Sequence, residues 1–152
     1  MRVEAKLKEM GLELPGVSRP VGSYVPVVRS GTLLFLSGHG PYRDGKRAYT
    51  GKLGQEYHVQ EGYEAARLVA LNCLATVKDL LGDLDRVKRV VKVLGFVSSS
   101  DGFVEQPQVI NGCSDLLVEL YGEAGRHARS AIGVAELPGG MPVEIEIVLE
   151  VG

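Results

Sequence analysis

The segment VEIEIVLEV alternates between apolar and mostly acidic side chains from Val143 to Val151. A period of two is the pattern of a β-strand that buries one face and leaves the other open. One side of this strand carries only apolar residues, namely Val143, Ile145, Ile147, Leu149 and Val151. The other side carries Glu144, Glu146, Val148 and Glu150. The pattern therefore predicts a sheet that other elements cover on one face only.

The preceding segment, residues 128–135, alternates in the same way and is followed by a turn rich in Gly and Pro. We expect its bulkier residues, Ile132 and Val134, to lie under the helices. Its other side is small or charged, with Arg129, Ala131, Gly133 and Ala135. Small side chains allow another backbone to approach closely. We therefore expect other copies of the same chain to cover the open face; a solvent-exposed sheet is the alternative.

Two opposite charges begin these strands, Arg129 in the first and Glu144 in the second. If the strands are antiparallel, their first residues lie on the order of 20 Å apart, at opposite ends of the sheet. Within one chain we expect Arg129 to lie near Glu150, directly or across an intervening strand, as an ordinary surface ion pair. For Arg129 and Glu144 to share a site, the glutamate has to come from a neighbouring subunit.

Two longer helices are predicted by apolar residues at helical spacing. The first runs from about Val59 to Leu81, with Gly82 as its C-terminal stop. Its apolar face carries Tyr63, Ala66, Ala70, Cys73, Val77 and Leu80. The second runs from about Val104 to Tyr121, with Ser100 or Asp101 as cap candidates. Pro107 fits only in a first turn, so this helix could begin slightly later.

The remaining elements are shorter. Val3, Leu7 and Met10 predict an N-terminal helix ending at Gly11, and residues 1–17 form this helix and a connector. VPVVRSGTLLFLSG predicts two strands turning at Ser30-Gly31, and VKRVVKVLGFVSS predicts another strand. Residues 38–58 are loop-like, with YTGKLG as a candidate edge strand.

The order β-β-α-β-α-β-β predicts an α/β (α+β) domain over residues 1–152, with a mixed sheet and two helices on one face. The net charge is −2 and the pI about 5.9, which gives no support for a basic nucleic-acid-binding face. The first residues lack an apolar leader, and no apolar run is long enough to span a bilayer, so a cytoplasmic protein is expected. Cys73 and Cys113 are expected to be buried free thiols.

Two other motifs resemble known binding sites but lack residues that those sites need. GPYRDGK, residues 40–46, resembles a phosphate-binding loop, but Arg47 stands where Ser or Thr is needed and no helix follows. His39, His58 and His127 lack the spacing and the cysteines of a zinc site, so no metal is expected.

Three segments together resemble the RidA/YjgF family of enamine/imine deaminases, also called endoribonuclease L-PSP. They are GSYVPVV with LLFLSG, ALNCLATVKDLLG, and ARSAIGVAELPGGMPVEIEIVLEV, within residues 18–151. The resemblance implies a chorismate-mutase-like fold of the Bacillus type and a homotrimer with ligand clefts between subunits. It also implies hydrolysis of 2-aminoacrylate and related imines to a 2-keto acid and ammonia, without a cofactor.

The resemblance also assigns residues to the site. Arg129 matches the arginine that grips the substrate carboxylate, a task suited to a planar guanidinium. Glu144 matches the glutamate that acts on the water or the amine, and Tyr24 matches a tyrosine that orients one of them. Three further positions match ligand contacts: Gly38, Asn111 and the backbone of Ala131.

The chain departs from the family pattern in ways that suggest a longer branch. His39 replaces the usual Gln after Ser-Gly, and GEAGRHARS adds Arg126 and His127. Two other functions stay open. One is RNA cleavage or translation inhibition, with a local basic patch formed by Lys88, Arg89, Lys92, Arg126, His127 and Arg129. The other is a non-catalytic trimer that binds a small carboxylate.

Overall fold

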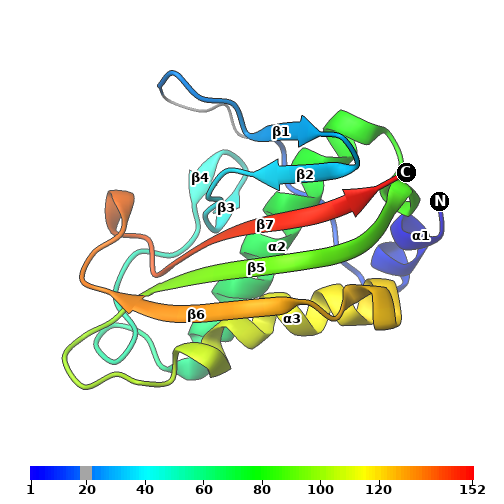
Figure 1. Ribbon diagram of the computed structural model, residues 1–152. Coiled ribbons are helices and arrows are strands. Elements are labelled where there is room, and N and C mark those ends of the chain that lie inside the picture. The colour runs from blue at the N-terminus through cyan, green and yellow to red at the C-terminus, as the bar shows by residue number, and fades with distance from the viewer. Residues whose placement is uncertain (18–21) are drawn as a thin grey trace.

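The computed structural model describes residues 1–17 and 22–152 (Figure 1). The described helices are α1 (Arg2–Glu9), α2 (Val59–Leu81) and α3 (Gln106–Tyr121), with short 3-10 turns at Leu84–Arg86, Gly122–Gly125 and Pro138–Gly140. The main sheet has the order β1-β2-β7-β5-β6, made of β1 (Val27–Ser30), β2 (Leu33–Leu36), β7 (Val143–Val151), β5 (Val87–Ser98) and β6 (Ala128–Val134). A separate ribbon pairs β3 (Tyr42–Arg43) with β4 (Lys46–Arg47).

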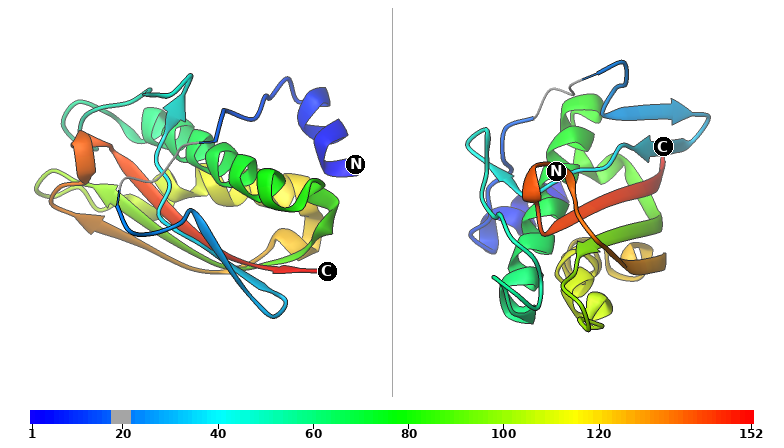
Figure 2. Two further views of the ribbon diagram at one scale, coloured as in Figure 1. Left: turned by 90° about the horizontal axis from the view of Figure 1, so that it is seen from above. Right: turned by 90° about the vertical axis from the view of Figure 1, so that its left-hand side faces the viewer.

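The sheet is mixed, as the element order predicts. β5 and β6 run parallel and are joined through α3, while β7 lies antiparallel between β2 and β5. Figure 2 shows that α2 and α3 lie on the same side of the sheet and leave the other side bare. The predicted α+β architecture with two helices on one face is confirmed.

The alternation of β7 is also confirmed. Its five apolar side chains are at most 2% exposed and pack under the helices, while Glu144, Glu146, Val148 and Glu150 point to the open side. Buried partners from both helices and from the neighbouring strands complete this core, among them Leu34, Val69, Val93, Ile110 and Leu117. The cysteines Cys73 and Cys113 lie within it as free thiols, as expected.

For β6, the predicted faces are inverted. Ile132 is 45% exposed on the open side, whereas Arg129 and Ala131 lie on the helix side. The reason is the close approach of α3 and the segment before it. A Cβ at Gly133 would come within 2.7 Å of Gln106 Nε2, so this side of the edge strand has room only for small residues. The bulky side chain of Ile132 therefore lies on the open face.

Several element boundaries also differ from expectation. The first hairpin turns at Gly31-Thr32, one residue later than predicted, because Ser30 pairs with Leu33. Helix α3 begins at Gln106 with Glu105 as its N-cap, and Pro107 lies in its first turn. Ser100 and Asp101 are not caps, because Ser100 accepts the backbone N–H of Phe103 at 3.1 Å in a separate turn.

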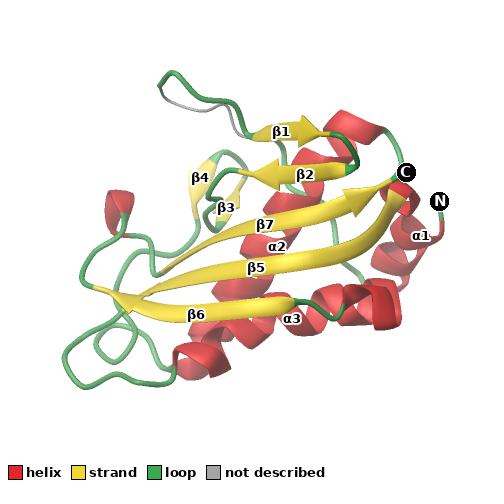
Figure 3. Cartoon of the chain, viewed as in Figure 1, coloured by secondary structure: helices red, strands yellow, loops and turns green. Residues whose placement is uncertain are grey.

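Residues 38–58 contain more order than a loop (Figure 3). Asp44 and Gly45 both have positive φ and form the two-residue turn of the β3–β4 ribbon. YTGKLG does not form an edge strand; within it, Leu53 makes isolated bridges to Tyr57 and Ser99. The predicted connector after α1 is described to its end at Val17, and residues 18–21 lie outside the described residues.

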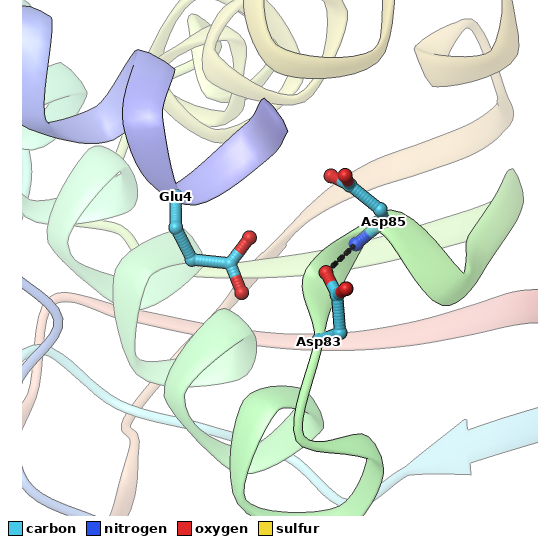
Figure 4. A group of neighbouring side chains, drawn as sticks. All are labelled: Glu4, Asp83 and Asp85. Atoms are coloured by element: carbon cyan, nitrogen blue, oxygen red, sulfur yellow. Dashed lines mark hydrogen bonds between the residues drawn. The ribbon is translucent and has the colours of Figure 1, made fainter. Parts of the chain in front are cut away.

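Acidic side chains fasten α1 to the rest of the molecule (Figure 4). Asp85 accepts the backbone N–H groups of Arg2 and Val3 at 2.6 and 2.8 Å, and these bonds lower the pKa of Asp85 to about 2. Glu4 pairs with Lys78 at 2.9 Å and accepts the N–H of Leu84 at 3.1 Å. Asp85 thus adds a negative group from outside the helix to the one that Glu4 places in the first turn of α1.

The open face of the sheet carries several large apolar side chains. Val28, Phe35 and Ile132 are 54%, 44% and 45% exposed, and Leu94, Phe96 and Val148 lie between them by register. An exposed apolar surface of this kind is typical of interaction sites. The expectation that the open face is covered thus rests on large apolar side chains rather than on small ones. Among the described residues, no helix is both long and apolar enough to cross a bilayer.

The contact between α2 and α3 depends on Gly112, because a Cβ there would overlap the carbonyl oxygen of Tyr63 on α2. Gly112→Ala is expected to destabilise the protein by about 2 kcal/mol or more, since the obstacle is backbone. Gly16→Ala is the control, because its Cβ would meet nothing within 4 Å. Urea unfolding of both variants measures the difference, and equal midpoints would contradict this account of the packing.

Candidate functional site

A cavity of about 790 Å³ lies at the end of β2. Its walls come from the segment before β1 (Tyr24, Pro26), the loop after β2 (Ser37 to Gly40, Tyr42), α2 (Asn72), and β7 with the turn before it (Met141, Glu144). Three of the predicted site residues, Tyr24, Gly38 and Glu144, therefore line one cavity. They come from three separate parts of the sequence.

Glu144 is half-buried against Gly38. Burial, aided by the neighbouring charge of Glu146, raises the pKa of the Glu144 carboxyl above its ordinary value. A Cβ at position 38 would come within 2.5 Å of Glu144 Oε2. Gly38 therefore makes the space that the carboxyl occupies. A carboxyl with a raised pKa can exchange a proton more readily near neutral pH.

His39 anchors the loop that carries Gly38. Its backbone exchanges hydrogen bonds with Ile145 of β7 at 2.9 and 3.0 Å. The ring Nδ1 donates to the carbonyl of Ser37 at 2.6 Å, so Nε2 accepts the hydroxyl of Thr76 at 2.8 Å. Burial lowers the pKa of His39. The ring is thus a neutral connection between the loop and α2, with both nitrogens in use.

Asn72 is a site residue that the sequence reasoning missed. It lies one turn before Thr76 on α2, and its amide nitrogen donates to the carbonyls of Tyr42 and Leu68, both at 2.9 Å. Asn72 and Thr76 are polar residues at i and i+4 in the buried part of a helix, where apolar residues are the norm. This spacing of polar residues in the sequence indicates that this face of α2 packs against polar groups of another segment.

Arg129 lies in a different place, beside a smaller recess of about 230 Å³. Its Nη1 donates to Asn111 Oδ1 at 2.7 Å and to Ser114 Oγ at 3.1 Å. The Ser114 hydroxyl in turn meets His127 Nε2 at 2.9 Å, and His127 Nδ1 donates to the carbonyl of Gly125 at 2.6 Å. Burial lowers the pKa of His127, and Arg129 adds to the effect.

The predicted pairing of Arg129 with Glu150 is wrong. Arg129 is level with Val93 and Ile147, whereas Glu150 is opposite Arg89 and Leu33, and the Arg129 side chain turns to α3. The same register decides where Arg129 stands relative to Glu144.

Arg129 and Glu144 do not meet within one chain. Glu144 is level with Phe96 and Ile132, so it lies two strands away from Arg129 and about 10 Å further along the strand direction. The two side chains also point to opposite faces of the sheet. The predicted residues thus divide into one group around Glu144 and one group of Arg129, Asn111 and Ala131.

A third polar group, Glu4, Asp83 and Asp85, places carboxylate oxygens within 4.8 Å of one another. Glu4 Oε2 and both oxygens of Asp85 already accept hydrogen bonds from N–H groups, and Asp83 Oδ1 accepts the N–H of Asp85. These bonds give the group a structural role in attaching α1.

Comparison with known proteins covers nearly the whole chain. Residues 4–143 match the family model described as "YjgF/chorismate_mutase-like, putative endoribonuclease". The Trypanosoma cruzi protein TCP17 is 48% identical over 150 residues, which cover 98% of this chain and 94% of that protein.

Two solved structures are also similar. A protein of unknown function from Agrobacterium tumefaciens is 46% identical with a TM-score of 0.91, covering 99% of this chain and 92% of its own. A putative endoribonuclease from Shewanella oneidensis MR-1 is 38% identical with a TM-score of 0.96, covering 99% and 100%.

Gly38→Ala is expected to displace the Glu144 carboxyl and return its pKa toward the ordinary value, because the burial that raises it is lost. The free energy of unfolding is expected to fall by only about 1 kcal/mol, because the obstacle is the flexible end of the Glu144 side chain. An NMR titration of labelled glutamate measures the pKa. Gly16→Ala, which also lines the cavity, serves as control, and a Glu144 pKa that stays raised in Gly38→Ala would refute the close-packing argument.

His39→Gln tests the neutral histidine. The unfolded chain takes up a proton near pH 6.5, whereas the folded His39 does so only at lower pH. The stability contributed by His39 is therefore complete above pH 6.5 and is lost as the pH falls below that value. When the pH is lowered from 7.5 to 5.5, the midpoint of urea unfolding is expected to fall less in His39→Gln than in the wild type. Equal losses would mean that His39 is not held neutral.

Proposed function

Because the chain belongs to the YjgF/chorismate mutase-like family, we propose that it hydrolyses small enamine and imine intermediates such as 2-aminoacrylate. The products are a 2-keto acid and ammonia, and the reaction takes place in a cleft between subunits of a homotrimer. The observation that carries the proposal is the cavity at the end of β2, where Glu144 with its raised pKa lies with Tyr24 and Gly38.

Arg129 supplies the carboxylate-binding group. Asn111 and Ser114 hold Nη1, which fixes the plane of the guanidinium. Among the described residues none accepts from Nε, and Nη2 has only a long contact of 3.5 Å to the carbonyl of Pro107. The Nε–Nη2 edge is therefore oriented for a substrate carboxylate, which it would bind through two charge-assisted hydrogen bonds.

Glu144 moves the proton. As a carboxylate it takes a proton from water while the water oxygen adds to the imine carbon. It then gives this proton to the nitrogen, which forms a carbinolamine. A second proton passes from the new hydroxyl through Glu144 to the nitrogen, the carbon–nitrogen bond breaks as the carbonyl forms, and ammonia leaves with the 2-keto acid. The raised pKa of Glu144 suits both steps near neutral pH. The Tyr24 hydroxyl orients the water or the imine, and positioning accounts for most of the acceleration.

A second copy of the chain is part of the proposal, because Arg129 and Glu144 lie on opposite faces of the sheet. The exposed apolar residues of the open face, including Phe35 and Ile132, favour association of copies through that face. In a homotrimer, Arg129 of one subunit would approach Glu144 of the next. Sedimentation of the purified protein tests the assembly separately from activity.

RNA cleavage is the second candidate, favoured by the name of the Shewanella relative and by three exposed basic residues of β5, Lys88, Arg89 and Lys92. A steep fall of RNA affinity with salt would support it. Non-catalytic binding of a carboxylate is the third, and it differs by showing affinity without turnover.

The decisive measurement is ammonia release from imines generated in situ. Arg129→Lys is expected to lower kcat/KM by about 10- to 100-fold, because lysine cannot form the two-point contact. Glu144→Gln is expected to lower kcat by about 100-fold or more. Glu150→Gln, on the same face of β7, is the matched control and should keep full activity. Equal activity of wild type and Arg129→Lys would remove the site assignment.

A further inference from the structure

Asn72 presents a fixed hydrogen-bond acceptor to the cavity. The side chain is 5% exposed. Its amide nitrogen donates to two backbone carbonyls, those of Leu68 and Tyr42. Carbonyl oxygens only accept, so the amide cannot be turned around, and Oδ1 must point away from both. The orientation of this oxygen is therefore set by the protein before any ligand arrives.

Oδ1 accepts no hydrogen bond within the described part of the chain, although it is not sealed off in the interior. Asn72 lines the cavity, and with Nδ2 turned toward the two carbonyls the oxygen is the end of the side chain left to face that space. An acceptor at the mouth of a largely buried side chain gains a hydrogen bond when a donor reaches it. Oδ1 is thus suited to receive a donor from a molecule in the cavity.

The rest of the cavity limits what that molecule can be. Its walls are mainly apolar or aromatic, with Pro26, Tyr42, Pro138 and Met141. Its volume of about 790 Å³ falls within the range of pockets that hold drug-sized ligands, ~300–1,000 Å³. A three-carbon acid such as 2-aminoacrylate would fill little of it. The cavity therefore has room for a side chain between Glu144 and Asn72.

We propose that Asn72 determines specificity by accepting a hydrogen bond from the far end of the substrate side chain. The preferred substrates are then those 2-imino acids whose aromatic or long apolar side chain ends in an N–H or O–H donor, such as a phenol or an indole. This inference rests on the proposed imine hydrolysis and deepens it. A side chain ending in a carboxylate is rejected, because it would face the Asn72 oxygen without a donor.

The test uses two pairs of substrates that differ only in the donor. The imines of tyrosine and phenylalanine differ by one hydroxyl, and those of tryptophan and 3-benzothienylalanine differ by N–H against sulfur. All four are generated in situ by an amino-acid oxidase with catalase. We expect wild-type kcat/KM to be about 10-fold or more higher for the donor-bearing member of each pair. Equal values in both pairs would overturn the inference.

Variants assign the preference to Asn72. Asn72→Leu should reduce each ratio to about 1, because the acceptor is gone. Asn72→Asp should keep the preference, because a protonated carboxyl donates to one carbonyl and retains an acceptor oxygen. Tyr42→Phe, which removes a hydroxyl from the same cavity but keeps the backbone carbonyl, should also keep it. The ratio of kcat/KM within each pair is compared, because misfolding of a variant lowers both values alike.

A binding measurement separates this inference from the proposed function. The 2-keto acids of the same pairs are titrated calorimetrically into wild type and Asn72→Leu. Tighter binding of the donor-bearing acid in wild type, lost in Asn72→Leu, supports the role of Asn72 even if no imine is hydrolysed. Absence of turnover with all four imines and with the imine formed from 2-aminoacrylate would defeat the proposed function alone. Equal binding of both members of each pair would defeat the Asn72 assignment alone.

Discussion

The fold depends on β7 being buried on one face and open on the other. This strand lies between β2 and β5, so its register positions both halves of the sheet. Val143 and Ile145 are fully buried beneath the helices, and the residue between them, Glu144, must point to the open side. The hydrophobic core thus fixes which side of the sheet receives the acid. The Gly38 loop, held to Ile145 through His39, then encloses it.

Prediction from the sequence succeeded for those elements whose residues follow one strong pattern. The long helix from Val59 to Leu81 has both periodicity and a glycine stop, and its predicted ends are those of the structure. The alternation of β7 gave its faces correctly, because every second residue is strongly apolar. The prediction of the two faces of β6 failed. Its only bulky residues are Ile132 and Val134, and the sequence does not show how closely Gln106 approaches Gly133. A tertiary contact decided that strand.

The candidate site shows the same limit. The family resemblance assigned Tyr24, Gly38 and Glu144 to one site together with Arg129, Asn111 and Ala131. The first three line one cavity, and their roles in binding or catalysis stay a prediction. Where Arg129 points could not be predicted, because its partners Asn111 and Ser114 lie on a helix and its register depends on β5. Asn72 was missed for a further reason. A polar residue in an apolar helix is a visible anomaly, but only the folded chain shows that its partner is the carbonyl of Tyr42.

The acidic side chains of β7 have a consequence for solution behaviour. Glu144 and Glu146 are neighbours on the open face, and the charge of Glu146 contributes to the raised pKa of Glu144. Apart from the proposed contact of Arg129 with Glu144, a second copy whose own acidic strand packed on this face would bring like charges toward them. Added salt screens such repulsion and therefore strengthens self-association, whereas it weakens contacts between basic residues and a polyanion. Ionic strength thus acts in opposite directions on the two kinds of partner this surface could have.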